Sequence, residues 1–213
     1  QMKELWLSSK GIDLDKETVE VNGARLAEAD LDIQLSDTAA VDTTTSENKW
    51  MINADSLSIH QSRVAIHLPG DTLHIDAYMG HAVAKETNID FGQNIYKVGS
   101  LRWDEGKLSY DNRFEPDVTG LDYNHIALTD INLGIDSINY TPQGTSFYIH
   151  NTRLKEKSGL EITELEGGVR LDSAFNKIQI PALVLKTPDS DLYTEVDMDF
   201  SAFGQQNPGK MKM

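Results

Sequence analysis

The chain contains no cysteine among its 213 residues. A disulfide framework, a thiolate nucleophile and a cysteine-based zinc site are therefore excluded. The absence leaves the redox character of the protein's compartment open, because a chain without cysteine is compatible with oxidising and reducing surroundings alike.

Long apolar runs and basic residues are also scarce. No run of about 18 apolar residues, the length of a transmembrane helix, occurs in the sequence. The first seven residues lack the apolar core of a signal peptide, so we expect either a cytoplasmic protein or a segment of a longer one. The 19 Lys and Arg residues against 34 Asp and Glu residues give a formal net charge of -15, which argues against nucleic acid as a partner.

Sequence signatures of catalysis are missing as well. The chain has no nucleophile elbow, no His-Glu-x-x-His helix, no phosphate-binding loop and no dinucleotide fingerprint. Three pairs of aspartates at i, i+2 spacing place both carboxylates on one strand face, as part of a general acidic face rather than a glycosidase or calcium site. These pairs are Asp13 and Asp15, Asp30 and Asp32, and Asp197 and Asp199. We expect a non-enzymatic protein without catalytic residues, metal or cofactor.

Four histidines, His60, His67, His74 and His81, stand seven residues apart. In a strand, an odd spacing sends consecutive members to opposite faces. We therefore expect solvent-facing strand residues rather than a metal site.

The most prominent pattern is alternation with a period of two. Residues 191–200 place Leu192, Val196, Met198 and Phe200 on one face of a strand and carboxylates on the other. Similar runs recur along most of the chain and are separated by turn formers at 69–71, 104–106, 142–144 and 167–168. The pattern predicts a meander of a dozen or more short strands joined by hairpins. Residues 24–29, between two alternating runs, are expected in a hairpin rather than a helix.

The alternation slips by one residue at three places: between Leu128 and Ile131, between Ile135 and Ile138, and across Pro181 between Ile180 and Leu183. Without a correction, a slip of one residue would move the apolar side chains of the strand to the solvent-facing side of the sheet. The chain must therefore turn or form a bulge at each of these points.

A sheet that is apolar on one side must cover that side. Because no helix is evident in the sequence, the sheet must close as a sandwich or barrel, or curl into a trough. We expect an all-β fold, an elongated, twisted antiparallel sheet curled into a trough, with a closed β-sandwich as the alternative. A trough leaves an apolar groove for acyl chains. The candidate lining residues are Leu73, Ile75, Ala77, Met79, Ile131, Leu133, Ile135, Leu183, Leu185, Val196, Met198 and Phe200.

Several sequence segments between residues 114 and 200 resemble those of a known protein family. They are Asn124-His-Ile-x-Leu-Thr-Asp-Ile-Asn-Leu133, Leu154-Lys-Glu-Lys-Ser-Gly-Leu-Glu-Ile162 and Leu183-x-Leu-x-Thr-Pro-Asp-Ser-x-Leu192. This part of the chain resembles the TamB family of AsmA-like translocation and assembly proteins, in the form found in Bacteroidetes-type bacteria. Residues 1–113 have the same alternation without such phrases, so we divide the chain into subregions 1–113 and 114–213, which we expect to be continuous.

The resemblance implies a long periplasmic protein, anchored in the inner membrane and reaching an outer-membrane barrel protein. Its middle would be a curled β-trough that conducts phospholipids between the two membranes, and the family has no catalytic residues. This chain lacks the anchor and the C-terminal domain of the family, so we expect an internal segment. The alternatives are a carbohydrate-binding β-sandwich that presents Trp50 and Trp103 at the cell surface, and an enzyme on a β scaffold that uses an aspartate pair.

Overall fold

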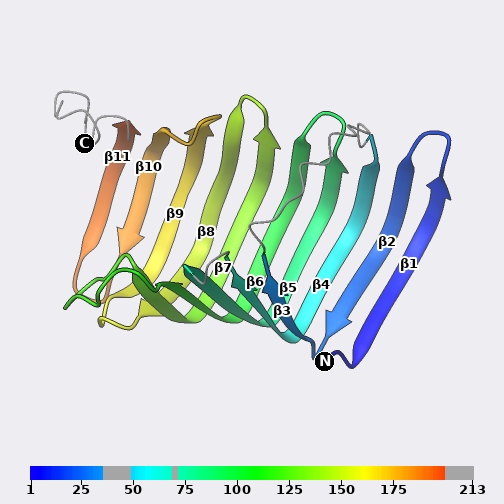
Figure 1. Ribbon diagram of the computed structural model, residues 1–213. Coiled ribbons are helices and arrows are strands. Elements are labelled where there is room, and N and C mark those ends of the chain that lie inside the picture. Colours follow the sequence, from blue (N-terminus) through cyan, green and yellow to red (C-terminus); the bar gives the residue numbers. More distant parts are fainter. Residues whose placement is uncertain (36–48, 69–71, 200–213) are drawn as a thin grey trace.

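A computed structural model describes residues 1–35, 49–68 and 72–199 of the chain. Within these ranges the regular structure is entirely β, and all eleven strands belong to one sheet (Figure 1). The strands are β1 (Glu4–Asp13), β2 (Thr18–Ala27), β3 (Asp30–Gln34), β4 (Met51–His67), β5 (Leu73–Asp90), β6 (Ile95–Asn112), β7 (His125–Thr141), β8 (Gly144–Glu156), β9 (Glu161–Asp172), β10 (Lys177–Lys186) and β11 (Asp191–Asp199). Neighbours in sequence are neighbours in space from β4 to β11.

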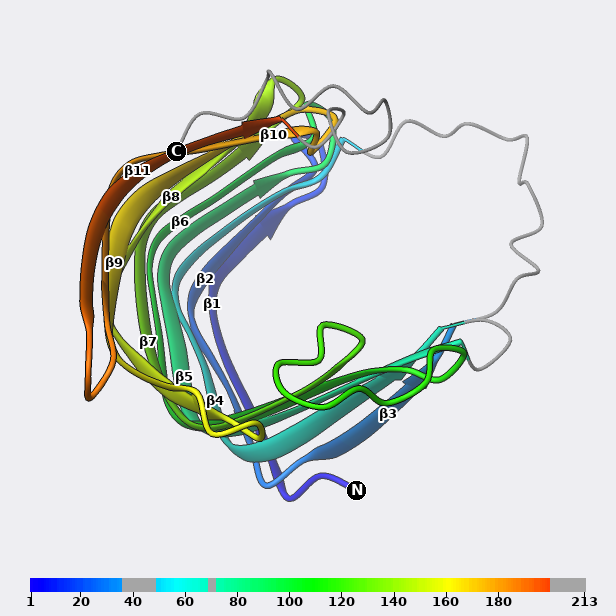
Figure 2. The same cartoon turned by 90° about the vertical axis from the view of Figure 1, so that its left-hand side faces the viewer.

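The sheet is curled, and its profile in Figure 2 is an arc that stays open on one side. The curl arises in mid-strand, at residues other than glycine with positive φ, such as Gln61 (φ 44°), Glu86 (φ 54°) and Glu105 (φ 54°). A single residue in this conformation breaks the extended path of the backbone and redirects the strand. The all-β, open, curled sheet expected from the sequence is confirmed.

Glycines stand opposite the bend residues on the neighbouring strand. The register of β5 with β6 places Gly99 opposite Glu86, and a Cβ at Gly99 would lie 2.6 Å from Oε2 of Glu86. In the same way, a Cβ at Gly80 would lie 2.6 Å from the Cβ of Glu105. Adjacent strands can therefore bend together because one of them has no side chain at the crowded point.

The strands are fewer and longer than the sequence pattern predicted, and two of the predicted hairpin turns are wrong. Residues 104–106 lie within β6, and Gly167 and Gly168 lie within β9. A bend with positive φ shifts the alternation by one residue, and in the sequence this shift looks like the end of a strand. The turn at 142–144 does connect β7 to β8, whereas the predicted turn at 69–71 lies outside the described residues.

All three predicted slips in the alternation coincide with irregularities of the sheet. Asp130 (φ 53°) and Ser137 (φ 55°) have positive φ in the first two intervals, and both intervals carry register shifts between β7 and β8. The third interval is a register shift between Ile180 and Leu183 in β10. The prediction of a turn or bulge at these points is confirmed.

The expected hairpin at residues 24–29 is wrong. Both β2 and β3 pair with β4 in parallel, with Val21 opposite Ala54 and Leu31 opposite Val64. The two short strands therefore follow one line beside β4, interrupted at Glu28 (φ 49°). A positive φ again divides one strand line into two alternating runs, and all other pairs of neighbouring strands are antiparallel.

The described strands of the two subregions, 1–113 and 114–213, belong to this one sheet. β6 and β7 pair from Tyr96 and Tyr140 at one end to Asp111 and His125 at the other. Residues 113–124, the most turn-rich stretch of the sequence, form the loop that joins these two strands.

We expect Glu86→Val to lower the free energy of unfolding by roughly 1–2 kcal/mol, because a β-branched side chain is strained at positive φ. Chemical denaturation measures the change. The neighbouring Lys85→Val, at a position without positive φ, should cost little, and Glu86→Gly should retain the stability of the parent chain. Equal stability of the two valine variants would contradict a conformational role for this bend.

Candidate functional site

Four buried residues that follow bends identify the concave face of the sheet. Ser62, Thr87, Ile131 and Thr152 are between 0% and 6% exposed, and each directly follows a residue with positive φ. The preceding bend residues, such as Gln61, are themselves exposed. In a sheet of one layer, the inside of a bend encloses a side chain on several sides. These buried positions therefore point into the concavity.

Cross-strand partners share a face of the sheet, so the register extends this assignment to whole rows of residues. Every row on the concave face is predominantly apolar. Two rows between the bends contain Ile59, Ala82, Trp103 and Leu133, and Leu57, Ala84, Leu101, Ile135 and Ile149. A row beyond the bends on one side contains Val64, Ala77, Leu108 and Leu128. A row beyond the bends on the other side contains Ile52, Ile89, Tyr96 and Tyr140.

The register places eleven of the twelve predicted lining residues on this concave face. Leu183 and Leu185 join it because Leu185 pairs with Leu165, which pairs with the buried Thr152. The eleven residues are Leu73, Ile75, Ala77, Met79, Ile131, Leu133, Ile135, Leu183, Leu185, Val196 and Met198. Phe200 lies outside the described residues.

Other members of the same rows, Leu57, Ile59, Leu101 and Trp103, were not among the predicted lining residues. Their alternation was visible, but their phase relative to Met79 or Leu108 is set by the bends at Gln61 and Glu105.

Among the residues that the structure describes, no second layer covers the concave face. In the described ranges the buried hydrophobic residues are five alanines, two valines and one isoleucine, without a leucine, methionine or aromatic residue. A closed sandwich would bury its large aliphatic side chains, whereas here they are half-buried. The alternative of a closed β-sandwich is therefore wrong, and the concave face of the open sheet is an apolar surface.

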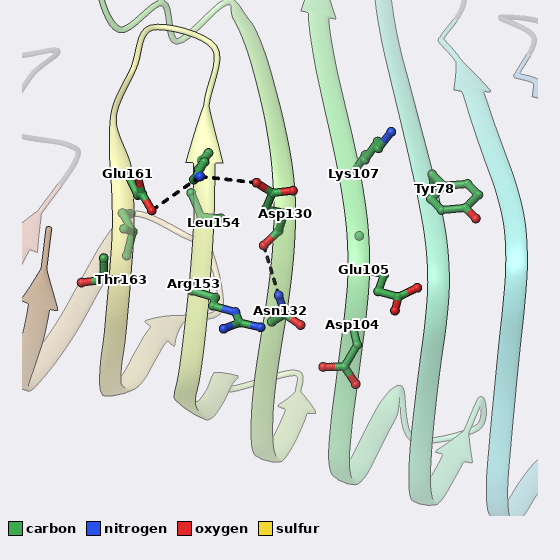
Figure 3. Close-up of a pocket in the computed structure, with 13 residues that line it drawn as sticks. Tyr78, Asp104, Glu105, Lys107, Asp130, Asn132, Arg153, Leu154, Glu161 and Thr163 are labelled. Carbon is green, nitrogen blue, oxygen red and sulfur yellow. Dashed lines mark hydrogen bonds and ion pairs between the residues drawn. The ribbon is translucent and has the colours of Figure 1, made fainter. Parts of the chain in front are cut away.

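The convex face is polar. A hollow of about 840 Å³ on this face crosses β5 to β9 near the bend at Glu105 (Figure 3). In it, Nζ of Lys155 lies 3.7 Å from carboxylate oxygens of both Asp130 and Glu161. No serine, cysteine or histidine is among the residues that line this hollow in the described chain. It is a solvated network of ion pairs without a nucleophile and base in contact.

All four regularly spaced histidines lie on this convex face, so the expectation that they alternate between faces is wrong. His60 pairs with His81, with ring centroids 4.6 Å apart, and His67 pairs with His74, with Nδ1 and Nε2 2.8 Å apart. The bend at Gln61 adds one residue to the alternation and so returns His67 to the face of His60. Burial, followed by the nearby His81, lowers the pKa of His60.

Each of the three aspartate pairs takes part in surface contacts. Oδ1 of Asp13 accepts hydrogen bonds from the backbone N–H groups of Asp15 and Lys16, at 3.1 and 3.0 Å, and thereby stabilises the turn after β1. Asp30 lies 3.0 Å from Arg63, and Asp197 lies 3.1 Å from Lys177. These carboxylates contribute to the solvated acidic surface that the sequence predicted.

The loop 113–124 is held by a buried carboxylate. Asp122 is 1% exposed and accepts hydrogen bonds from the backbone N–H groups of Val118 (2.9 Å) and Asn124 (3.0 Å), and Nδ1 of His125 lies 2.9 Å away. The hydrogen bond from Val118 is the largest cause that lowers the pKa of Asp122, to about 2. The hydrogen bond to Asp122 in turn raises the pKa of His125. Asp117 lies 3.5 Å from His125 and completes a cluster of three residues with the donor atoms of a metal site. The carboxylate of Asp122, however, already accepts hydrogen bonds from the backbone of the loop.

We expect the protection of the Val118 amide from hydrogen exchange to be greatest between about pH 4 and 6.5. The contribution of Asp122, whose pKa is lowered from 3.8, is lost as the pH falls through its folded value. The contribution of His125, whose pKa is raised from 6.5, is lost as the pH rises through its folded value. Exchange rates corrected for the intrinsic effect of pH measure this window. Asp122→Ala should remove the protection at every pH, and protection that is flat from pH 3 to 8 would refute the pairing.

Trp103 lies on the inside of a bend. A Cβ at Gly106 would lie 2.5 Å from its indole ring, and its Nε1 is buried without a hydrogen-bond partner. This tryptophan packs across the bend and is not an open platform for a sugar ring.

In the described part of the chain, no helix has the length and apolar character needed to cross a membrane. The chain matches no protein-family model, no curated protein and no solved structure.

Proposed function

We propose that the concave face of the sheet binds the acyl chains of phospholipids. The single observation that carries this proposal is an uncovered apolar face that runs through all the long strands of an open, curled sheet. A contiguous apolar surface that stays uncovered in the folded chain indicates a place where apolar ligands bind. Each CH₂ group that leaves water contributes about 0.8 kcal/mol.

In this proposal the protein is a non-enzymatic segment of a TamB-like cell-envelope protein of the periplasm. The whole protein would be anchored in the inner membrane and would contact an outer-membrane barrel protein, so that phospholipids pass along the groove between the membranes. The resemblance of residues 114–200 to that family supports the assignment, as does a trough-shaped sheet. The acidic convex face would keep the segment in water and away from anionic bilayer surfaces.

The groove should accept acyl chains of different lengths. Burial and dispersion have no direction, and the concave rows contain few polar groups that could recognise a headgroup. Headgroups would remain in the water at the open side of the trough.

Native mass spectrometry of the purified chain, together with titration by a fluorescent fatty acid, tests the proposal. We expect phospholipids of mixed chain length to co-purify, and we expect saturable binding of the fatty acid that added phospholipid competes away. Absence of saturable binding in the titration would overturn the proposal, whether or not lipid co-purifies. Binding to a glycan array that disappears in Trp103→Ala would favour the carbohydrate-binding alternative, which the packing of Trp103 does not support.

A further inference from the structure

A small hollow lies on the convex face over β5 to β8, and β4 and β9 continue the sheet on either side of it. It encloses about 300 Å³, and its lining includes Lys85, Ser100, Arg102, Gly134 and His150. Gly134 provides the room. A Cβ at this position would lie 2.7 Å from Cε1 of His150, so the imidazole ring occupies the space beside the bare backbone. The hollow is therefore built into the middle of the sheet.

Three hydrogen-bond donors surround this hollow because of the register of β5 with β6. Ser100 and Arg102 stand on either side of Leu101, which lies in a concave row, so both side chains point to the convex face. Lys85 is directly opposite Ser100, and Arg102 is one row further along. Diagonal neighbours of this kind are roughly 7–8 Å apart, within reach of long side chains. An ammonium, a hydroxyl and a guanidinium can therefore contact one ligand between them.

The two cations of the hollow have no acidic partner. Among the described residues, no carboxylate lies within ion-pair distance of Lys85 or Arg102, and both residues are exposed. The carboxylate in the lining, that of Asp136, instead lies 3.1 Å from Nε2 of His150. In a chain with a formal net charge of -15, two neighbouring cations without carboxylate partners create a local site for an anion.

We propose that this hollow binds the phosphate group of a small, water-soluble anion. The guanidinium of Arg102 would donate two parallel hydrogen bonds to it, the ammonium of Lys85 would donate a charge-assisted bond, and the hydroxyl of Ser100 would donate one more. A phosphate group matches these donors because its oxygens are arranged tetrahedrally, whereas the two oxygens of a carboxylate lie in one plane. Phosphate binding and acyl-chain binding are independent, because the hollow and the concave face lie on opposite sides of the sheet.

The phosphate of a lipid headgroup has the same chemistry, but the surface around the hollow disfavours a bilayer. Glu86 directly follows Lys85 in β5, and Asp104 and Glu105 follow Arg102 in β6. An anionic bilayer would have to approach these carboxylates together with the two cations, whereas a small anion enters the hollow alone. The surrounding charge therefore favours a soluble anion.

Isothermal titration calorimetry of the purified chain with inorganic phosphate, at low ionic strength, provides the first test. We expect saturable binding whose dissociation constant rises at least about tenfold in Arg102→Gln and in Lys85→Gln, because each change removes one charged donor. Lys97→Gln is the matched control. Lys97 is exposed on the same face of β6, opposite Asn88 and Asn139, and does not line the hollow. Absence of saturable binding by the parent chain, or an equal loss in Lys97→Gln, would overturn the proposal.

Two further variants separate this site from the concave face. Val83→Asp places a carboxylate opposite Arg102 inside the hollow, and it should abolish phosphate binding while a fluorescent fatty acid still binds. Leu133→Asp should have the reverse effect. Phosphate binding that survives Val83→Asp would overturn the location of the site. In flotation with vesicles of phosphatidic acid, the parent chain and Lys85→Gln should behave alike. Vesicle binding that Lys85→Gln abolishes would identify a lipid headgroup as the source of the phosphate and overturn the assignment to a soluble anion.

Discussion

Leu133→Asp is expected to weaken the binding of a fluorescent fatty acid at least about tenfold, without unfolding the sheet. Leu133 lies on the concave face between Trp103 of β6 and the bend at Asp130, near the middle of the groove. In the free protein, the new carboxylate faces the water of the open trough. When an acyl chain covers it, the carboxylate loses that water without gaining a partner. This loss of solvation destabilises the complex and not the free protein.

The matched control is Val83→Asp, which places the same carboxylate on the convex face. Val83 belongs to β5 and stands opposite Arg102, in a row that faces away from the groove. We expect this variant to bind the fatty acid as the parent chain does. Circular dichroism and thermal melting establish that both variants are folded. If both variants bound equally well, acyl chains would not occupy the concave face, and the proposed function would lose its basis.

Gly106→Ala is expected to lower the free energy of unfolding by about 1–3 kcal/mol. An added Cβ would lie 2.5 Å from Cε2 and Nε1 of Trp103 and 3.0 Å from the Cβ of Ile131. Ile131 is 3% exposed, so neither it nor the indole ring has free space on the inside of the bend. The extra methyl group must push the ring away or open the bend between β6 and β7.

Gly168→Ala serves as the control for this second prediction. Gly168 also lies in mid-strand, but the nearest atom to an added Cβ would be Cδ2 of Tyr148 at 3.7 Å, which is an ordinary contact. We expect this variant to lose little stability in urea denaturation. A Gly106→Ala protein as stable as Gly168→Ala would mean that the bend at Glu105 relaxes freely. The packing of Trp103 would then not be a determinant of the curl.

Much of the architecture followed from the alternation of side chains. The pattern correctly predicted an all-β sheet, and the slips around Ser137 and Pro181 correctly located irregularities in β7 and β10. The same reasoning failed at residues 104–106, where it predicted a hairpin and the structure has a bend within a strand. In the sequence, one residue with positive φ and a true strand end both look like a break in the alternation, because each interrupts the period by about one residue.

The faces of individual residues were harder to predict than the strands. The histidines at 60 and 67 were expected on opposite faces because the local period is two, but the bend at Gln61 places both on the convex side. The parallel pairing of β2 and β3 with β4 was likewise not visible, since alternation is the same in parallel and antiparallel strands. The sites of the bends could be inferred only where a one-residue shift separates two clearly alternating runs, as between Leu128 and Ile131.

By itself, the sequence determined that this protein is a sheet with one apolar side. Successive side chains of a strand point to opposite faces, so the face of each residue relative to its neighbours can be read from the local sequence. Only the tertiary structure decided that the apolar side is the inside of an open curl. That outcome depends on single residues with positive φ meeting glycines on the next strand, as Glu86 meets Gly99, and this is a contact between positions that local periodicity does not connect. The curl turns a row of half-buried aliphatic side chains into a groove because bends of the same sense recur on neighbouring strands.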